Sequence, residues 1–301
     1  MRDHSLKAFA ESKKIEYREN EAMALHTSFK IGGAADLFLK PKTSEELCAL
    51  VVEAKRENLP FFILGNGSNL LVSDKGIEGA VICTTAMNGL RMVGENEIFA
   101  EAGATLAALC RFARDHALSG LEFAYGIPGS VGGALYMNAG AYGGDMSMVV
   151  TSAQSITVTG ELVTRSAGEL GLGYRKSIFE ENGEIITGVT LRLKKGNPEE
   201  ITEAMDTFMG KRKASQPLEY PSAGSTFKRP TGYFAAALID GCGLKGLTVG
   251  GAQVSEKHAG FVINRSGATC EDVLALVREI QKIVKEREKV DLETEIIFVG
   301  R

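Results

Sequence analysis

The chain has 301 residues, of which 44% are apolar and 24% charged, and its formal net charge is −4. The length predicts two or three domains, and the composition is typical of a globular protein. A weakly acidic chain without a long basic run is not expected to bind nucleic acid, and no apolar stretch is long enough to cross a bilayer. The N-terminal residues lack the apolar core of a secretion signal, so we expect a cytoplasmic protein. The sequence leaves the oligomeric state open.

The cysteines and histidines give no sign of a metal site. Both residue types are dispersed along the chain, and no two cysteines are spaced as a CxxC pair. Neither a zinc site nor a redox dithiol is therefore predicted, and the cysteines are expected to be buried free thiols.

In the first half of the chain the predicted helices and strands alternate, which indicates α/β packing. A helix is predicted over residues 43–58, because Thr43 and Glu46 fit a capping box in front of an apolar stripe. Another is predicted from Thr105 to about residue 118, where a Ser-Gly pair ends it. Strands are predicted at 60–65, 80–84, 98–102, 152–159 and 185–193.

A break at residues 194–200 introduces the second half of the chain. Asn197 as a cap and Pro198 at the first helical position predict a helix that runs to about Arg212. Beyond it we expect a loop at 216–232, a short helix at 233–240, strands at 248–254 and 260–264, a long helix from Thr269, and a closing strand at 290–300. Domain boundaries are expected near residue 75 and within 197–215.

The most informative stretch is GIPGSVGGALYMNAGAYGG at residues 126–144, in which seven of 19 residues are glycine. So many glycines are not expected in an ordinary helix or strand, because each costs extra backbone entropy there. They allow backbone N–H groups to approach an anion, and a pyrophosphate is the natural candidate. A flexible surface loop is the alternative, but the apolar residues within the run favour burial.

Two more glycine loops lie earlier in the chain. GNGSNLLVSD at 65–74 follows a predicted strand, yet it is not a Rossmann fingerprint, because Leu70 stands in place of the third glycine. It is not a P-loop either, because no Gly-Lys-Ser/Thr follows. TSFKIGGAADLF at 27–38 also permits close backbone approach. Each loop alone is weak evidence, but the three together predict one extended ligand with two phosphates.

The order of these motifs is similar to that of a known enzyme family. TSFKIGG, GNGSNLLVSD, AGATLAALCRFA and GLEFAYGIPGSVGGALYMNAGAYGG resemble the FAD-binding domain of the vanillyl-alcohol oxidase type. GLGYRKS, SAGSTFKRP, LKGLTVGGAQVSEKHAGFVIN and LETEIIF then resemble the UDP-N-acetylenolpyruvoylglucosamine reductase family, in its branch without an extra tyrosine-bearing loop. The resemblance runs from about Leu25 to the C-terminus.

This resemblance implies an α+β fold, with a two-part FAD-binding domain of the vanillyl-alcohol oxidase type and a C-terminal α/β substrate-binding domain. The implied FAD-binding subdomains are residues 1–75 and 76–213, and the substrate-binding domain is 214–301. The implied activity is the NADPH-dependent reduction of UDP-N-acetylglucosamine enolpyruvate to UDP-N-acetylmuramate in peptidoglycan precursor synthesis. Hydride passes from N5 of non-covalently bound FAD to C3 of the enolpyruvyl group, and an acid protonates C2.

Three residues match the family's catalytic positions. Ser225 matches the proton donor to C2, and Arg175 matches the residue that holds the substrate carboxylate and spreads the developing charge. Glu295 matches a carboxylate that polarises the donor or relays its proton. Glu293 lies two residues earlier, and only the motif distinguishes the two glutamates.

The resemblance also implies ligand contacts. Those expected for FAD are Ile31, Gly32, Gly33, Gly65, Asn66, Gly67, Ser68, Asn69, Gly126, Ile127, Pro128, Gly129, Ser130, Gly132, Gly133, Asn138, Gly140 and Ala141. Those expected for the substrate are Tyr174, Gln216, Lys228, Arg229 and His258. A core role for His258 is equally expected. Arg229 stands where some family members carry Asn, so the residue that contacts the diphosphate stays open.

Two other functions are compatible with part of the pattern. One is another FAD-dependent oxidase or dehydrogenase of the same fold, which would lack SAGSTFKRP and LETEIIF. The other is a module that binds a flavin or a nucleotide sugar without turnover.

Overall fold

The computed structural model describes residues 5–301, which form two compact units. Of the described residues, unit 1 comprises 5–18, Leu37–Asn66 and Gly79–Lys211, and unit 2 comprises Glu19–Asp36, Gly67–Glu78 and Arg212–Arg301. Each unit therefore contains segments that are far apart in the sequence. The division into 1–75, 76–213 and 214–301 stays a prediction.

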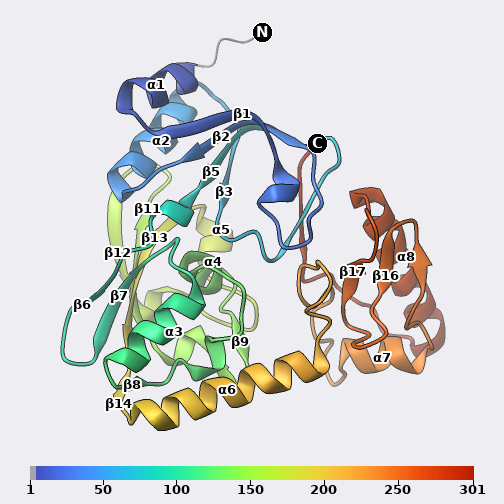
Figure 1. Ribbon diagram of the computed structural model, residues 1–301. Helices are drawn as coiled ribbons and strands as arrows, with labels where there is room; N and C mark the ends of the chain where they lie inside the picture. Colours follow the sequence, from blue (N-terminus) through green and yellow to red (C-terminus); the bar gives the residue numbers. More distant parts are fainter. Residues whose placement is uncertain (1–4) are drawn as a thin grey trace. The chain divides into compact units, whose positions relative to one another are not determined.

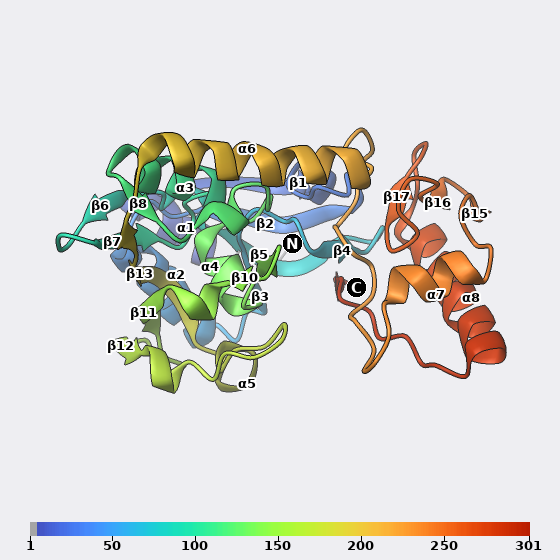
Figure 2. The same ribbon diagram turned by 90° about the horizontal axis from the view of Figure 1, so that it is seen from below.

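The larger sheet of unit 1 is antiparallel and has the strand order β12-β11-β13-β7-β6. Its strands are β6 (Leu90–Met92), β7 (Glu97–Glu101), β11 (Val150–Ile156), β12 (Leu162–Ser166) and β13 (Ile185–Arg192). Helices α3 (Leu106–Asp115) and α4 (Val131–Tyr136) pack against it, and Ile201 and Met205 of α6 (Pro198–Ser215) join the same core (Figures 1 and 2). The predicted strands at 98–102, 152–159 and 185–193 are thus confirmed.

A second sheet has the strand order β1-β2-β5-β3. Its strands are β1 (Glu16–Ala22), β2 (Ala34–Lys40), β3 (Phe61–Leu64) and β5 (Ile77–Cys83). Within unit 1, α1 (Ser5–Lys13) and α2 (Ser44–Arg56) share an apolar core with this sheet. Helix α2 begins as predicted, because the Thr43 side chain accepts a 3.2 Å hydrogen bond from the Glu46 amide. The Glu46 carboxylate reaches one residue further back than expected, to the Lys42 amide at 2.7 Å.

Unit 2 is built around α7 (Ala235–Gly241) and α8 (Cys270–Glu288), with the small sheet β15-β16-β17 beside them (Figure 1). Its strands are β15 (Thr248–Val249), β16 (Ala252–Val254) and β17 (Val262–Asn264). Phe29, Ile31 and Leu71 are buried in the same core as residues of the last third of the chain. The two early segments that carry these residues are therefore part of the C-terminal unit's interior.

Three expectations about secondary structure were wrong. The predicted strand at 290–300 is only β18 (Ile297–Val299), because its parallel partner β4 (Leu70–Val72) offers three residues for pairing. The predicted strand at 248–254 is a hairpin that turns at Gly250 and Gly251. Inside the glycine-rich run, where no helix was expected, α4 forms because burial of Val131 and Leu135 outweighs the low helix propensity of glycine.

Within residues 5–301, no helix combines the length and the apolar character that a membrane span requires.

An ion pair links three strands of the larger sheet. Glu184 lies next to β13 and accepts hydrogen bonds from Arg165 of β12 and from the Ser155 hydroxyl of β11, the latter at 2.7 Å. The Arg165 guanidinium, followed by the Ser155 hydroxyl, lowers the pKa of the nearly buried Glu184 carboxyl below its usual 4.5. A carboxyl with a depressed folded-state pKa stabilises the fold above its unfolded pKa and loses that effect as pH falls.

We predict that Glu184→Gln lowers the free energy of unfolding at pH 7 by about 1–2 kcal/mol. The deficit should shrink as pH falls below the usual carboxyl pKa of 4.5. Urea denaturation at several pH values measures this, with Glu181→Gln as the control, since Glu181 forms an exposed pair with Lys176. A deficit that is constant with pH would show that the charge of Glu184 contributes nothing.

Candidate active site

The loop that follows β3 presents consecutive backbone amides without acceptors. Among the described residues, none of the amides of Gly65, Asn66, Gly67, Ser68 and Asn69 donates a hydrogen bond. Gly67 is buried, and a buried amide without an acceptor is costly, so its natural partner is a ligand. Successive N–H groups in one turn bind anions such as phosphate. No helix opens after this loop; strand β4 follows, as the absence of a Rossmann fingerprint predicted.

Glycine is required at Gly67 for reasons of space and backbone geometry. Its φ is +60°, and a Cβ there would lie 2.0 Å from the His26 carbonyl oxygen. Gly65 has a similar restriction in unit 1, where a Cβ would lie 2.3 Å from the Ser130 hydroxyl. The Asn66 side chain donates a 2.6 Å hydrogen bond to the Pro128 carbonyl, which ties this end of the loop to the glycine-rich run.

The glycines of residues 27–38 were predicted to let the backbone approach a ligand, and some of them let two segments of the chain pack closely together. The Gly33 amide donates to the Ser73 carbonyl at 2.9 Å, and a Cβ on Gly33 would lie 2.2 Å from the Asp74 carbonyl oxygen. A Cβ on Gly32 would lie 2.7 Å from Val72. These two glycines let residues 31–34 run against the segment after β4. Their contact with a cofactor stays a prediction.

The amides of the glycine-rich run are likewise of two kinds: some bond to other parts of the chain, and some have no acceptor among the described residues. The amides of Val131 and Gly132 donate to the carbonyls of Ala104 and Ala102, each at 2.8 Å. The amides of Gly126, Gly129 and Ser130 donate to no other described residue. The early part of the run, before α4, therefore has amides to offer to an anion.

Arg175 occupies the tip of a tight turn that favours glycine. Gly173 and Lys176 exchange backbone hydrogen bonds of 3.0 and 3.3 Å, which leaves Tyr174 and Arg175 as the two loop residues. Arg175 has φ +52°, a left-handed conformation that costs a non-glycine residue about 1 kcal/mol. Its guanidinium lies 5.2 Å from the centre of the Tyr174 ring, and one nitrogen is 3.5 Å from the Gly140 carbonyl.

The glycine-rich run holds this turn in place. The Asn138 side chain donates to the Gly173 carbonyl at 2.9 Å and accepts from the Ser147 amide at 3.0 Å. The buried Ser177 hydroxyl donates to the Tyr136 carbonyl at 2.7 Å. Both polar ends of the Asn138 side chain are thus occupied within unit 1, where they orient the turn that bears Arg175.

Ser225 is presented by a segment that is pinned on both sides in unit 2. The Thr226 amide donates to the Gly260 carbonyl, and the Thr226 carbonyl accepts from the Glu295 amide, both at 2.8 Å. Gly224 has φ +78°, and Thr226 and Phe227 are buried. Ser225 lies between Gly224 and Thr226 and is exposed. The segment therefore holds the serine hydroxyl toward solvent on a fixed backbone.

The two glutamates of the LETEIIF motif have different surroundings. The Glu295 amide bonds to Thr226, so Glu295 lies directly across from the residue after Ser225. Glu293 is largely exposed, and its carboxylate lies 3.4 Å from the Lys228 ammonium. Glu293 is thus paired with Lys228 through its side chain, and Glu295 with Thr226 through its backbone; which glutamate assists Ser225 stays a prediction.

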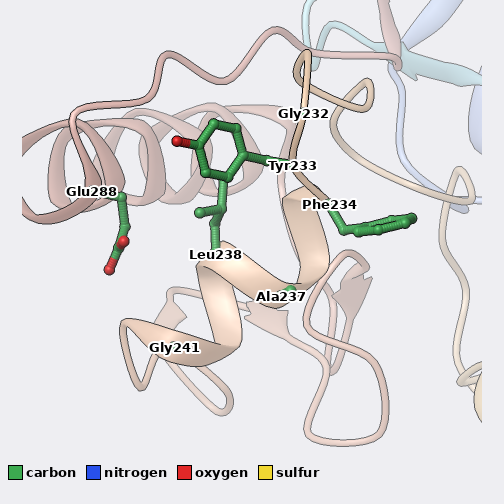
Figure 3. Close-up of a pocket in the computed structure, with 7 residues that line it drawn as sticks. All are labelled: Gly232, Tyr233, Phe234, Ala237, Leu238, Gly241 and Glu288. Atoms are coloured by element: carbon green, nitrogen blue, oxygen red, sulfur yellow. The ribbon is translucent and has the colours of Figure 1, made fainter.

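The other substrate candidates lie near these segments of unit 2. The Arg229 guanidinium lies 4.6 Å from the centre of the Phe234 ring, and Phe234 is 62% exposed. Figure 3 shows the shallow pocket beside it, where the Tyr233 ring stands over Leu238 while Phe234 points away. Glu288 completes the lining.

Gln216 and His258 differ in how far their polar atoms are occupied. The Gln216 side-chain oxygen is buried and has no partner among the described residues. The His258 Nδ1 accepts from the Gly260 amide at 3.2 Å, and burial lowers the pKa of its ring. His258 is thus a neutral residue that holds a turn; its contact with a substrate stays a prediction.

The residues present fit a bound dinucleotide such as FAD. Unpaired amides are available at the two places where the sequence predicted a diphosphate. No group of three or more metal-ligating side chains occurs within residues 5–301.

Comparison with known proteins agrees with this interpretation. Residues 35–166 match the family model of an FAD-binding domain, and residues 216–299 match that of the UDP-N-acetylenolpyruvoylglucosamine reductase C-terminal domain. The chain is 49% identical to the UDP-N-acetylenolpyruvoylglucosamine reductase of Clostridium novyi over 287 residues, which cover 95% of this chain and 93% of the relative. The chain belongs to the UDP-N-acetylenolpyruvoylglucosamine reductase family.

Further similarities extend over the whole chain. The corresponding reductase of Caldanaerobacter subterraneus is 49% identical over 281 residues, which cover 93% of each chain. The crystal structure of the reductase from Thermus caldophilus superposes with a TM-score of 0.81 at 37% identity and covers 95% of this chain and 99% of that one. The predicted combination of an FAD-binding domain and a C-terminal reductase domain is thus confirmed. The protein is an oxidoreductase with FAD as its cofactor and NADPH as its reductant.

We predict that Gly67→Ala abolishes FAD binding, because the added Cβ would collide with the His26 carbonyl at 2.0 Å. Gly267→Ala is the matched control, since Gly267 has φ +61° and nothing within 4 Å of the position of its Cβ. The control should lose about 1 kcal/mol of stability and keep its flavin. The flavin absorbance of the purified proteins measures both outcomes, and a Gly67→Ala variant that stays fully yellow would contradict the assignment.

We predict that Arg175→Gly is more stable than Arg175→Ala by about 1 kcal/mol, although both lack the guanidinium. The two variants differ only in how well the backbone tolerates φ +52°. Thermal and urea denaturation of the pair give the difference. Equal stabilities would mean that the turn relaxes once the arginine is removed.

Proposed function

We propose that this protein reduces the enolpyruvyl group of UDP-N-acetylglucosamine enolpyruvate to give UDP-N-acetylmuramate, with NADPH as the source of hydride. The observation that carries the proposal is the pairing of the Ser225 and Glu295 segments. The Glu295 amide and the Thr226 carbonyl are joined by a 2.8 Å hydrogen bond, which fixes a hydroxyl and a carboxylate on neighbouring stretches of chain. Proton delivery to carbon requires such a fixed donor and a group that assists it.

FAD would be held by the unpaired amides of residues 65–69 and by those of Gly126, Gly129 and Ser130. When bound, it would supply the redox chemistry that links hydride from NADPH to C3 of the enolpyruvyl group. The remaining cofactor contacts expected from the sequence are part of the same proposal.

The protein's own residues deal with the charge that hydride addition leaves at C2 and on the adjacent carboxylate. We assign Arg175 to that carboxylate, because a guanidinium binds it with two parallel hydrogen bonds and disperses the charge. Ser225 donates its hydroxyl proton to C2, and Glu295 polarises the hydroxyl or returns a proton to it. The strained turn of Arg175 fits such a role, because backbone strain is often found at functional positions.

The nucleotide half of the substrate is assigned to the cationic segment after Ser225. Lys228 and Arg229 supply the positive charge that a diphosphate needs. The Phe234 ring beneath the Arg229 guanidinium holds that side chain in a defined place. Tyr174, Gln216 and His258 complete the proposed contacts. The product belongs to the cytoplasmic synthesis of peptidoglycan precursors, and we place the protein in that compartment.

The activity is tested by NADPH consumption with and without the enolpyruvyl nucleotide, each measured both in air and under anaerobic conditions. We expect sustained consumption only with the nucleotide, and UDP-N-acetylmuramate as the product. An oxidase of the same fold would instead consume its donor with oxygen alone, and a binding module would show no turnover. Either result would contradict the proposal.

We predict that Ser225→Ala leaves reduction of the bound flavin by NADPH within about twofold of wild type and slows reoxidation by the enolpyruvyl nucleotide by about 100-fold or more. Loss of the donor affects only the step that protonates carbon. Stopped-flow absorbance of the flavin follows the two half-reactions separately. Equal losses in both would show that Ser225 has a structural role.

A further inference from the structure

The side chain of Asn69 is directed to the strand that carries Glu295. Its Nδ2 donates a 3.0 Å hydrogen bond to the Glu295 carbonyl, and the backbone carbonyl of Asn69 accepts from the Ile297 amide at 2.9 Å. Asn69 is therefore hydrogen-bonded to the residues on both sides of Ile296. The parallel pairing of Leu70 with Ile297 continues directly from this contact.

The same residue also belongs to the run of unpaired amides. Among the described residues, the backbone N–H of Asn69 has no acceptor, as is true of the four residues before it. Asn69 thus has one amide available for a bound anion and another that is fixed to Glu295. A ligand that orders residues 65–69 therefore also orders the Asn69 side-chain amide, which is hydrogen-bonded to the Glu295 carbonyl.

The Glu295 backbone is held from two directions as a result. Its carbonyl accepts from the Asn69 side chain, and its amide donates to the Thr226 carbonyl at 2.8 Å. Thr226 follows Ser225 directly. The hydrogen bonds therefore run without a break from the loop, through Glu295, to the segment of the proposed proton donor, all within unit 2.

A second connection reaches the same segment from the TSFKIGG motif. The Ser28 amide donates to the Gly67 carbonyl at 3.1 Å, and the Ser28 hydroxyl donates to the Ser222 carbonyl at 2.6 Å. The loop of unpaired amides is thus bonded to both segments that carry the proposed catalytic groups.

We propose that Asn69 is a positioning residue, whose side-chain amide fixes Glu295 and couples the order of the cofactor loop to the alignment of Glu295 with Ser225. The role of Glu295 in this statement rests on the proposed function; the coupling itself does not. The requirement is for a hydrogen-bond donor at a fixed distance. An aspartate of the same shape would fail, because a carboxylate accepts only and would repel the Glu295 carbonyl.

The first test follows amide hydrogen exchange with and without FAD in the full-length protein. In the wild type, FAD should slow exchange both in residues 65–69 and in residues 293–297, by about tenfold or more. In Asn69→Asp and Asn69→Ala the effect should persist in the loop but fall below about twofold at 293–297. Thr269→Ala, which removes the N-cap of α8 in the same unit, controls for general loss of stability and should keep both effects.

The second test separates the half-reactions of the same variants. In Asn69→Asp and Asn69→Ala, reoxidation by the enolpyruvyl nucleotide should lose about 10- to 100-fold more than reduction by NADPH does, because the acid is misplaced rather than absent. Wild-type exchange at 293–297 in the Asn69→Asp variant, or equal loss in both half-reactions, would overturn the proposal. If the wild type failed to reduce the nucleotide, the proposed function would fall while the exchange experiment still tested the coupling.

Discussion

The five consecutive unpaired amides of residues 65–69 are the constraint on which the proposed mechanism depends. Gly67 is the buried residue among them, and a ligand is the natural partner of its amide, because buried N–H groups that find neither protein nor water partners are costly. Gly67 makes the turn possible, and Asn69 at its end connects it to Glu295. In the proposed mechanism, cofactor binding and proton delivery are linked through this one short loop, and residues of two early segments of the chain lie in the core of unit 2.

The sequence predicts those elements whose local signals agree with their packing. Thr43 and Thr105 cap α2 and α3 as expected, since a side-chain acceptor beside an apolar stripe is a strong local signal. Strand β1 (Glu16–Ala22) could not be predicted, because its residues are mostly exposed and polar and give no alternation. Helix α4 was missed for the opposite reason: tertiary burial overrides the glycine content that argued against a helix.

The residues of the candidate site can be divided in the same way, into those that local sequence patterns indicate and those that only the tertiary structure shows. Short motifs give Ser225, Arg175 and Glu295 as catalytic candidates. Such motifs can be recognised in the sequence without knowledge of the fold. The bond between Asn69 and Glu295 joins residues 226 positions apart, and no local pattern specifies such a contact. Asn138 shows the same limit: the ligand contact that the sequence indicates stays a prediction, while the hydrogen bonds by which its side chain holds the Arg175 turn could not be read from the sequence. Several glycines of the three loops, such as Gly32 and Gly33, likewise allow close packing between segments of the chain.

The central claim, that the loop amides bind the cofactor's diphosphate, is tested most directly by a crystal structure of the FAD complex. The account predicts diphosphate oxygens within about 3 Å of the amide nitrogens of residues 65–69, with the Asn69 side chain still bonded to the Glu295 carbonyl. A diphosphate bound elsewhere, with those amides facing solvent, would contradict it.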